Sequence, residues 1–390
     1  MCTYDKLEKI AEYLNPSDYR LLVDEYHSLL KAYSYRDEAI NGVLKSFNDY
    51  KSFCFMSATP IAAEFKPSIL EGVKEIIAEW NDMDIVTVKL EQTNKPYVMA
   101  ANIINSYKKD GYITVDGIKS YEAFFFVNSV TDIKAIVDYC NLTTDEIRII
   151  CSDNQRNANK LEGIKISNSN SENKMFTFLT SKSFEGVDYF SETGICYVVS
   201  SSTNPNTLAS IDTDIPQIAG RIRTKTNPFR NKIIHIYNTR SKNLSLDISY
   251  EEMVEKTNNA IKDTIDTVEM FNNSPLNVKN KLRKNLKDRL NDMYMSYNDD
   301  DDKFIVNDIL PKLELYNYKV NQVIYSSGIA LSKSYNDNNI ATTKINWETL
   351  NENIDKKITD KLSFKDAFIR YAEIYDNMIY SFETDHILSI

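Results

Sequence analysis

The sequence has few of the residues that form disulfides, zinc sites and tight backbone turns. Its 390 residues include 5 cysteines, 3 histidines and 9 glycines, and the cysteines and histidines lie far apart along the chain. Neither a disulfide framework nor a zinc site is therefore indicated. No apolar run approaches the roughly 18 residues of a membrane-spanning helix, and the amino terminus lacks the apolar core of a signal peptide. We expect an intracellular protein without membrane contact.

The composition is that of an ordinary soluble protein, and the net charge is negative. Hydrophobic residues make up 42% and charged residues 26%, and the length is enough for two or three domains. The 46 basic and 56 acidic residues give a net charge of -10. That balance argues against general adhesion to nucleic acid but leaves room for a local basic groove.

Residues 1–92 have the pattern of one α/β unit. Apolar strands are predicted at 21–23 and 53–56, with a helix over 36–47 between them, so the strands should be parallel neighbours. Asp24 and Glu25 follow the first strand, and Ser57 and Thr59 follow the second. Ligands bind at such strand ends in open parallel sheets. The structural alternative is that the acidic pair and the Ser-Ala-Thr turn only end a strand and cap a helix.

A second parallel α/β unit is predicted after a linker at 91–95. Strands are expected at 123–127, 147–151, 175–179, 195–200 and 233–237, with a helix over 131–140 capped by Ser129. His235, inside an apolar strand, is expected to be a core residue. From 243 onward long helical patterns dominate, including a capping box at Ser249 and Glu252 and a core-facing helix over 363–378.

Two stretches of the second unit carry residues suited to phosphate chemistry. Gly186 allows close backbone approach to a ligand, and Asp188 adds a carboxylate beside it. In the second stretch a helix starting at Pro216 would place Gln217 and Arg221 on one face. An arginine reaching a transferred phosphoryl group is worth roughly three to five powers of ten in rate.

Taken in order, these stretches resemble the motifs of superfamily 2 helicases of the DExH-box type. Asp24-Glu25-Tyr26-His27 is similar to motif II, Ser57-Ala58-Thr59 to motif III and residues 126–129 to motif IV. Residues 180–188 look like motif V and 217–223 like motif VI, while Thr3-Tyr4-Asp5 is similar to motif Ib. The Gly-Arg-Ile-Arg ending is closest to origin-binding and replication helicases of large DNA viruses and phages. The resemblance covers about residues 1–240.

The resemblance implies two RecA-like lobes, 1–92 (incomplete) and 93–242, followed by a mostly helical C-terminal domain over 243–390. It implies ATP and Mg²⁺ as cofactors, with magnesium at Asp24, and nucleic acid as partner, DNA rather than RNA. The resemblance also implies that the protein acts in the cytoplasm of a bacterial cell or of an infected host cell. The residues expected in hydrolysis are Glu25, Gln217, Arg221 and Arg223. Those expected to bind nucleotide are Asp24, His27, Gly186 and Asp188. Ser57 and Thr59 would couple hydrolysis to movement.

Nucleic acid is expected at Thr180 and Ser181. A helix over 278–290 also presents Lys279, Arg283 and Lys287 on one side, which either follow a DNA backbone or form a solvated face.

The sequence departs from the helicase pattern at two points. No Gly-Lys dipeptide occurs, so the phosphate-binding loop is missing, and only 23 residues precede Asp24, whereas a βαβ unit needs roughly 30. We expect a split gene, an alternative start or a partner polypeptide to account for the missing loop, and the chain alone to hydrolyse ATP feebly or not at all. The alternative is a degenerate helicase-like module that binds nucleic acid or a replication partner without turnover.

The second departure is in the motif VI stretch. Thr224 stands where the common pattern has a second arginine, and Arg223 lies about 200° around a helix from Arg221. Both arginines can serve only if the helix ends between them. Arg221 is the preferred arginine finger, and Arg223 is a close second.

Overall fold

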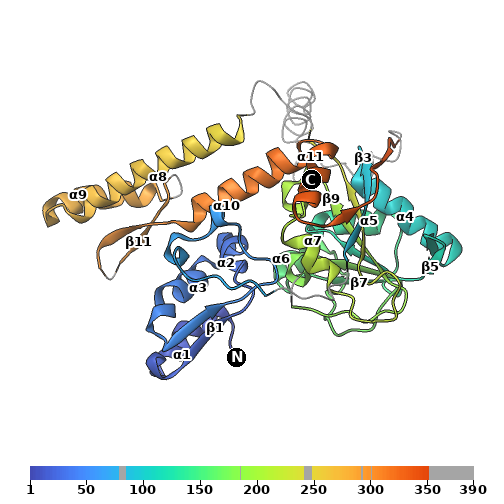
Figure 1. The fold of residues 1–390 in the computed structure, drawn as a ribbon, viewed down its shortest axis with the longest axis horizontal. Coiled ribbons are helices and arrows are strands. Elements are labelled where there is room, and N and C mark those ends of the chain that lie inside the picture. Colours follow the sequence, from blue (N-terminus) through green and yellow to red (C-terminus); the bar gives the residue numbers. More distant parts are fainter. Residues whose placement is uncertain (79–84, 185, 241–247, 291–292, 300, 351–390) are drawn as a thin grey trace, which may run out of the picture.

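The described part of the chain contains two parallel β-sheets, which a long helical segment connects (Figure 1). This computed structural model describes residues 1–78, 85–184, 186–240, 248–290, 293–299 and 301–350. The predicted helix over 363–378 lies outside the described residues. None of the helices that the structure describes has the length and apolar character needed to cross a membrane.

The first segment is a small α/β unit built as the sequence predicted. Its elements are α1 (Leu7–Ala11), β1 (Arg20–Val23), α2 (Ser28–Lys31), α3 (Tyr33–Ser46) and β2 (Ser52–Phe55). The two strands are parallel, with Leu21 opposite Phe53 and Val23 opposite Phe55. One face of this sheet packs on Phe47 through edge-to-face ring contacts. On the other face Leu22 is 58% and Met56 43% exposed, so within the described residues that face is uncovered.

The second sheet has eight strands in the described part of the chain, in the order β13-β3-β10-β9-β6-β8-β7, with β14 also on β3. All of these pairings are parallel. Its strands are β3 (Thr87–Thr93), β6 (Ala123–Phe126), β7 (Ile147–Ile150), β8 (Phe176–Leu179), β9 (Ile195–Ser200), β10 (Lys232–Tyr237), β13 (Ala341–Thr342) and β14 (Asn346–Glu348). Strands β6 to β9 are buried along their whole length, as expected where helices cover both faces of a parallel sheet.

Helices and a small hairpin accompany this sheet. They are α4 (Pro96–Asp110), α5 (Val130–Tyr139), α6 (Gln155–Lys160) and α7 (Asp214–Ala219), with the hairpin β4 (Ile113–Val115) and β5 (Ile118–Ser120). Ser129 caps α5 as predicted, because its side chain accepts a hydrogen bond from the Asp132 amide. The α/β class with a large parallel sheet is thus confirmed.

The linker predicted at 91–95 is wrong. Residues 91–93 belong to β3, which pairs with β10, and α4 begins at Pro96. Two polar residues of this stretch, Glu91 and Gln92, are buried and have partners. Asn346 donates to the Glu91 carboxylate at 2.6 Å, and Gln92 accepts from the Tyr237 hydroxyl at 3.3 Å.

The region after 248 is helical in large part, but it is not separate from the two sheets. Its elements are α8 (Tyr250–Asn272), α9 (Leu276–Asp288), the hairpin β11 (Met295–Asn298) and β12 (Lys303–Val306), α10 (Ile309–Tyr318), the π-helix η8 (Lys319–Val323) and α11 (Gly328–Asp337). The predicted capping box at Ser249 and Glu252 is present. The chain then returns to the large sheet through β13 and β14, so the helical C-terminal domain is not confirmed as a unit.

Helix α10 ties the first segment to the rest of the molecule. The Tyr316 ring packs edge-on against Phe65 at 5.3 Å, and the Asn307 side chain donates to the Tyr33 hydroxyl at 2.9 Å. In the other direction the Tyr316 hydroxyl donates to Asp212 at 2.9 Å. The helices α8 and α9 project away from this junction as an arm (Figure 1).

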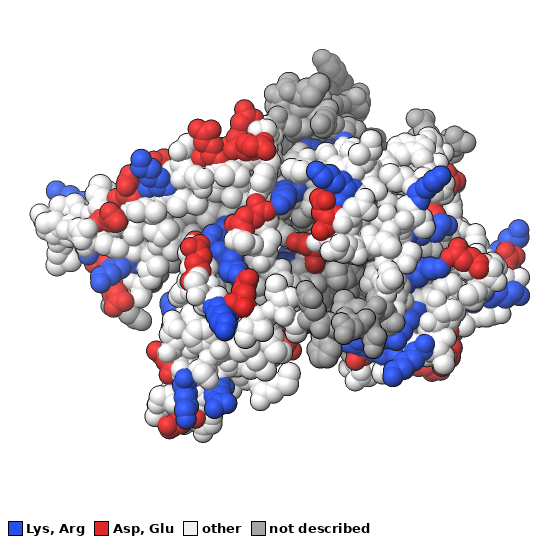
Figure 2. All heavy atoms as spheres, in the orientation of Figure 1, with Lys and Arg blue, Asp and Glu red and all other residues white. Residues whose placement is uncertain are grey.

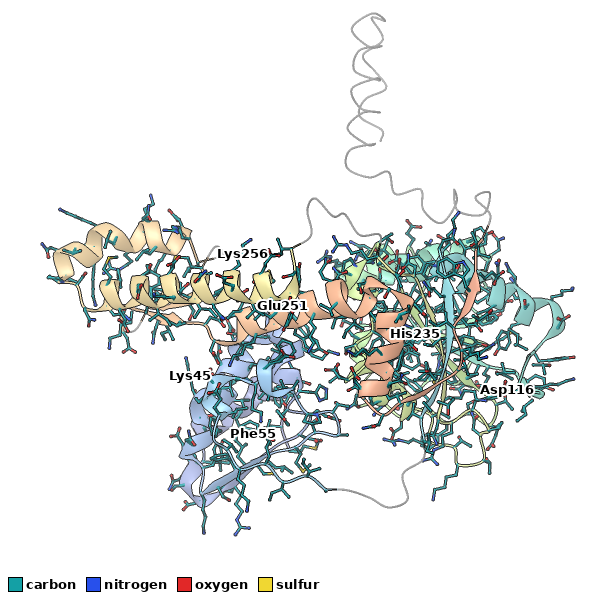
Figure 3. The ribbon with its side chains drawn as sticks, turned by 45° about the horizontal axis from the view of Figure 1, so that its top comes forward. Lys45, Phe55, Asp116, His235, Glu251 and Lys256 are labelled. Atoms are coloured by element: carbon teal, nitrogen blue, oxygen red, sulfur yellow. The ribbon has the colours of Figure 1, made fainter. Side chains whose placement is uncertain are left out.

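His235 is a core residue, as predicted. It lies within the body formed by the large sheet (Figure 3) and is fully buried. Its Nδ1 is 2.8 Å from the Tyr335 hydroxyl, and its Nε2 is 3.1 Å from Ser200 and 3.2 Å from the Tyr325 hydroxyl. These bonds attach the C-terminal helices to β9 and β10.

Candidate active site

The acidic tip of β1 has an unusual backbone conformation. Glu25 has a φ of 49°, in the left-handed region that residues other than glycine seldom adopt. Its amide donates to the Asp24 side chain at 3.0 Å, and the Tyr4 hydroxyl donates to the Asp24 carbonyl at 2.6 Å. Asp24 itself is exposed. Strain of this kind persists where surrounding contacts enforce it and is common at functional sites.

The tips of β1 and β2 meet in a hydrogen-bonded group. The Ser57 hydroxyl lies 2.7 Å from Nδ1 of His27 and 3.2 Å from the Glu25 carboxylate. Thr59 Oγ1 lies 3.3 Å from the same His27 nitrogen. His27 and Thr59 are buried. Parallel pairing of the two strands is what places these four side chains together.

Gln217, on α7 of the large-sheet unit, joins this group. Its side-chain nitrogen lies 3.2 Å from Glu25 Oε2 and 3.3 Å from Thr59 Oγ1. Arg221 donates to the Gln217 side-chain oxygen at 3.2 Å, to the Gln217 carbonyl at 2.8 Å and to the Val187 carbonyl at 3.1 Å. We refer to Glu25, His27, Ser57, Thr59, Gln217 and Arg221 as the Glu25 cluster.

The motif VI stretch has a different local structure from the one predicted. Helix α7 begins at Asp214, two residues before Pro216, and ends at Ala219. Arg221 therefore does not share a helical face with Gln217. Instead the chain runs alongside Tyr189. The Tyr189 amide donates to the Arg221 carbonyl at 2.8 Å, and the backbone amide of Arg223 donates to the Tyr189 carbonyl at 2.8 Å. The helix ends before both arginines, so their predicted separation around it does not apply.

The motif V stretch divides into two places. Arg223 donates to Asp188 at 2.8 Å, and Gly186, with a φ of 67°, lies beside the Val187 carbonyl that binds Arg221. Thr180 and Ser181 lie instead at the tip of β8, where the Ser181 amide donates to Asn128 at 3.0 Å. The two residues expected to bind nucleic acid are therefore set apart from the Glu25 cluster.

The basic face of α9 is paired within the arm. Arg283 donates to both oxygens of Asp302, at 2.8 and 2.7 Å, and Lys287 pairs with Asp299 at 2.8 Å. The Arg283 hydrogen bonds hold the pKa of Asp302 at about 2. The third basic residue, Lys279, lies over the Phe271 ring at 5.4 Å. On the face in Figure 2 basic and acidic side chains alternate, with acidic ones gathered at the start of α8.

Sequence reasoning missed an ion pair between the two α/β units. Lys31, at the end of α2, pairs with Asp214, the first residue of α7, and also donates to Ser210 at 3.1 Å. Burial alone would raise the pKa of the Asp214 carboxyl, but the charge and hydrogen bonds of Lys31 and Ser210 outweigh it and lower that pKa. An acidic residue in a first helical turn is too common a signal to have indicated this partner.

The described residues contain no group of three or more His, Cys, Asp and Glu that could hold a metal ion. Magnesium is often bound by one or two carboxylates together with substrate phosphates, so the predicted role of Asp24 does not require such a group. The comparisons with known proteins give no further guide, because the chain matches no family model and no curated protein.

Proposed function

We propose that this chain is a portion of an ATP-dependent DNA helicase or translocase. The observation that carries the proposal is the contact of Gln217 with Glu25 and Thr59. This contact unites the stretches that resemble motifs II, III and VI, although they come from two α/β units. A nucleotide bound where two units meet can couple its hydrolysis to their relative movement, which is what a translocase requires.

In this function each polar group has a defined role. Asp24, exposed beside the cluster, would hold Mg²⁺ together with the nucleotide phosphates, and the Glu25 carboxylate would orient the attacking water. Arg221 stabilises charge on the transferred phosphoryl group after leaving its Val187 contact. Ser57 and Thr59 connect the Glu25 carboxylate to Gln217, and so transmit the state of the nucleotide across the junction.

Single-stranded DNA is proposed to lie across the tips of β6 and β8, at Thr180 and Ser181. Binding there is mainly to phosphate oxygens, to which the Thr180 and Ser181 hydroxyls can donate hydrogen bonds. The basic face of α9 takes no part in this proposal, because Arg283 and Lys287 pair with Asp302 and Asp299 and Lys279 lies over the Phe271 ring. The resemblance to helicases is the ground for proposing DNA rather than RNA as the partner. The same resemblance is the ground for proposing the cytoplasm of a bacterium or infected cell as the site of action.

The phosphate-binding loop is proposed to come from an upstream segment or from a partner polypeptide. The sequence has no Gly-Lys dipeptide, and such a loop follows a strand of the same sheet as motif II in this family. The uncovered face of β1 and β2, with Leu22 and Met56 exposed, supports the addition of further elements to this sheet. The partner would carry a strand followed by Gly-Lys-Ser or Gly-Lys-Thr.

The experiment measures ATP hydrolysis with and without single-stranded DNA. The purified chain is tested alone and mixed with the polypeptide encoded immediately upstream of it. We expect feeble turnover by the chain alone, DNA-stimulated turnover in the mixture, and loss of that turnover in Glu25→Gln. Strong turnover by the chain alone that Glu25→Gln abolishes would falsify the need for a partner.

A scaffold that grips DNA without turnover is the second candidate, and one observation favours it. The described contacts of Arg221 engage Nε and both terminal nitrogens with Gln217 and Val187, so the guanidinium is held by the protein itself. DNA binding that is unaffected by ATP and by Glu25→Gln, with no hydrolysis in any mixture, would establish this candidate.

A further inference from the structure

Phe190 is a large apolar side chain that lies uncovered beside the candidate active site. It is 69% exposed, and within the described residues its ring contacts no other aromatic ring and no cation. Single exposed apolar residues are common and need no explanation by themselves. Phe190 differs because it belongs to the stretch that also carries Asp188 and the Val187 carbonyl, to which Arg221 donates.

The Phe190 ring lies on the same side of its segment as the ion pair of Asp188 and Arg223. The backbone around Tyr189 is extended, because its amide and carbonyl hydrogen-bond to Arg221 and Arg223. Successive side chains of an extended segment point to opposite sides. Tyr189 accordingly lies in the core, 1% exposed, whereas Asp188 and Phe190 face solvent. The ring and the ion pair therefore form one surface.

The backbone that carries this ring is fixed on both sides. The Asn173 side chain donates to the Phe190 carbonyl at 2.7 Å. The next amide, that of Ser191, donates to the Thr224 hydroxyl at 3.0 Å. A group that is already held in place loses little further freedom when a ligand binds to it. Phe190 is thus an exposed ring at a defined position.

The position of Phe190 relative to Arg221 suits the two ends of a nucleotide. The Arg221 guanidinium donates to the Val187 carbonyl at 3.1 Å, and Phe190 is three residues further along the chain. Three residues of extended backbone span roughly 10 Å, which is similar to the length of a triphosphate with its ribose. Asp188 lies between the two and can accept a hydrogen bond from a ribose hydroxyl.

We propose that the Phe190 ring stacks on the base of the nucleotide whose terminal phosphate lies at the Glu25 cluster. This inference rests on the proposed function and adds the residue that distinguishes a nucleoside triphosphate from other polyphosphates. An aromatic ring stacks on the flat face that every base has. The contact therefore selects for the presence of a base and discriminates little between adenine and guanine.

Stacking on a base of the DNA strand is the competing use of this ring. The strand is proposed to lie at Thr180 and Ser181, at the tip of β8, which is set apart from the Glu25 cluster. Phe190 instead follows directly on the segment that contacts Arg221. The nucleotide is therefore the ligand that this position favours.

The test measures binding by isothermal titration calorimetry to the chain mixed with the polypeptide encoded immediately upstream. The ligands are the non-hydrolysable analogues AMP-PNP and GMP-PNP, and inorganic tripolyphosphate, each with Mg²⁺. For the wild-type chain we expect the two nucleotides to bind within about threefold of each other and more tightly than tripolyphosphate. Phe190→Ala should weaken both nucleotides on the order of 5- to 150-fold and leave tripolyphosphate unchanged. Phe190→Tyr, which keeps a ring, should bind like wild type.

Phe190→Trp gives a direct readout of stacking. Its added fluorescence, measured against that of the wild-type chain with its two tryptophans, should be quenched by AMP-PNP and not by tripolyphosphate. Tyr13→Ala is the matched control, because it removes another exposed ring, 84% exposed, from the first segment. It should bind all three ligands like wild type. Circular dichroism checks folding, and if Phe190→Ala does not fold, the quenching of Phe190→Trp decides alone.

Equal affinity of the wild-type chain and Phe190→Ala for AMP-PNP overturns the stacking contact and leaves the proposed helicase function standing. Failure of both nucleotides and of tripolyphosphate to bind overturns both proposals. Binding of labelled single-stranded DNA, measured by fluorescence anisotropy, identifies the competing use. If Phe190→Ala weakens DNA binding but not nucleotide binding, the ring belongs to the strand and this inference is overturned.

Discussion

The Gln217 side-chain nitrogen lies 3.2 Å from the Glu25 carboxylate, although the two residues are 192 positions apart. The Gln217 oxygen accepts from Arg221 at the same distance. The Gln217 side chain therefore links Glu25, at the tip of β1, to Arg221. An amide serves here because it offers a donor to the carboxylate and an acceptor to the guanidinium at once.

A charge at this position should disrupt the junction. Gln217→Glu replaces the donor facing Glu25 with a second carboxylate, and we expect it to lower the free energy of unfolding by about 2 kcal/mol at pH 8. Urea denaturation followed by circular dichroism measures the change. Gln155→Glu, on the exposed side of α6, is the control and should have little effect. Equal stability of the two variants would show that the Gln217 contact contributes nothing.

The ion pair between Lys31 and Asp214 should be visible in stability. Lys31→Met leaves a poorly exposed carboxylate without its cation, and we expect a loss of about 3 kcal/mol at pH 7. The double variant Lys31→Met, Asp214→Leu should recover part of this loss. Without Lys31, burial is the largest influence left on the Asp214 carboxyl, and it acts to raise its pKa. The deficit of the single variant should therefore shrink as the pH is lowered from 7 towards 4.

His235 should make the folded state sensitive to mild acid. Burial lowers the pKa of His235 to about 3, whereas an unfolded histidine titrates near 6.5. Between these values the unfolded chain binds the extra proton, so stability is complete above pH 6.5 and falls as the pH decreases. From pH 7.5 to 5.5 we expect this residue to contribute a loss of about 1.4 kcal/mol. His235→Gln has no titrating group at this position. Between pH 7.5 and 5.5 its free energy of unfolding, measured by urea denaturation, should therefore fall by about 1.4 kcal/mol less than that of the wild-type chain.

Neutralising the basic face of α9 should leave DNA binding unchanged. In the variant Lys279→Gln, Arg283→Gln, Lys287→Gln the arm loses its pairs with Asp299 and Asp302, so its own stability falls. The slope of log affinity against log salt concentration should match that of the wild-type chain. A slope shallower by about two to three would mean that these side chains contact phosphates and that the pairs with aspartate open on binding.

The sequence predicted those parts of the fold that local patterns determine. Strands β1 and β2 are short apolar runs bounded by polar residues, and the caps at Ser129 and Ser249 need only the residues within one helical turn. The meeting of Ser57 and Glu25 also followed from local information, because a helix between two strands makes them parallel neighbours.

Distant partners account for what the sequence could not predict. Glu91 and Gln92 look like linker residues until Asn346 and Tyr237 bind them inside the sheet. The end of α7 before Arg221 depends on pairing with Tyr189, which lies in another stretch of the chain. Asp299 and Asp302, which follow β11, pair with Lys287 and Arg283 of α9, and no local pattern indicates these partners.

The return of β13 and β14 to β3 has a practical consequence for shortened forms of the protein. Both strands hydrogen-bond along the outer side of β3, a seven-residue strand. A chain cut before Ala341 would leave the amides and carbonyls of that side without protein partners. Exposed strands of this length recruit copies of themselves, so such a truncation is expected to self-associate even though it retains both candidate sites.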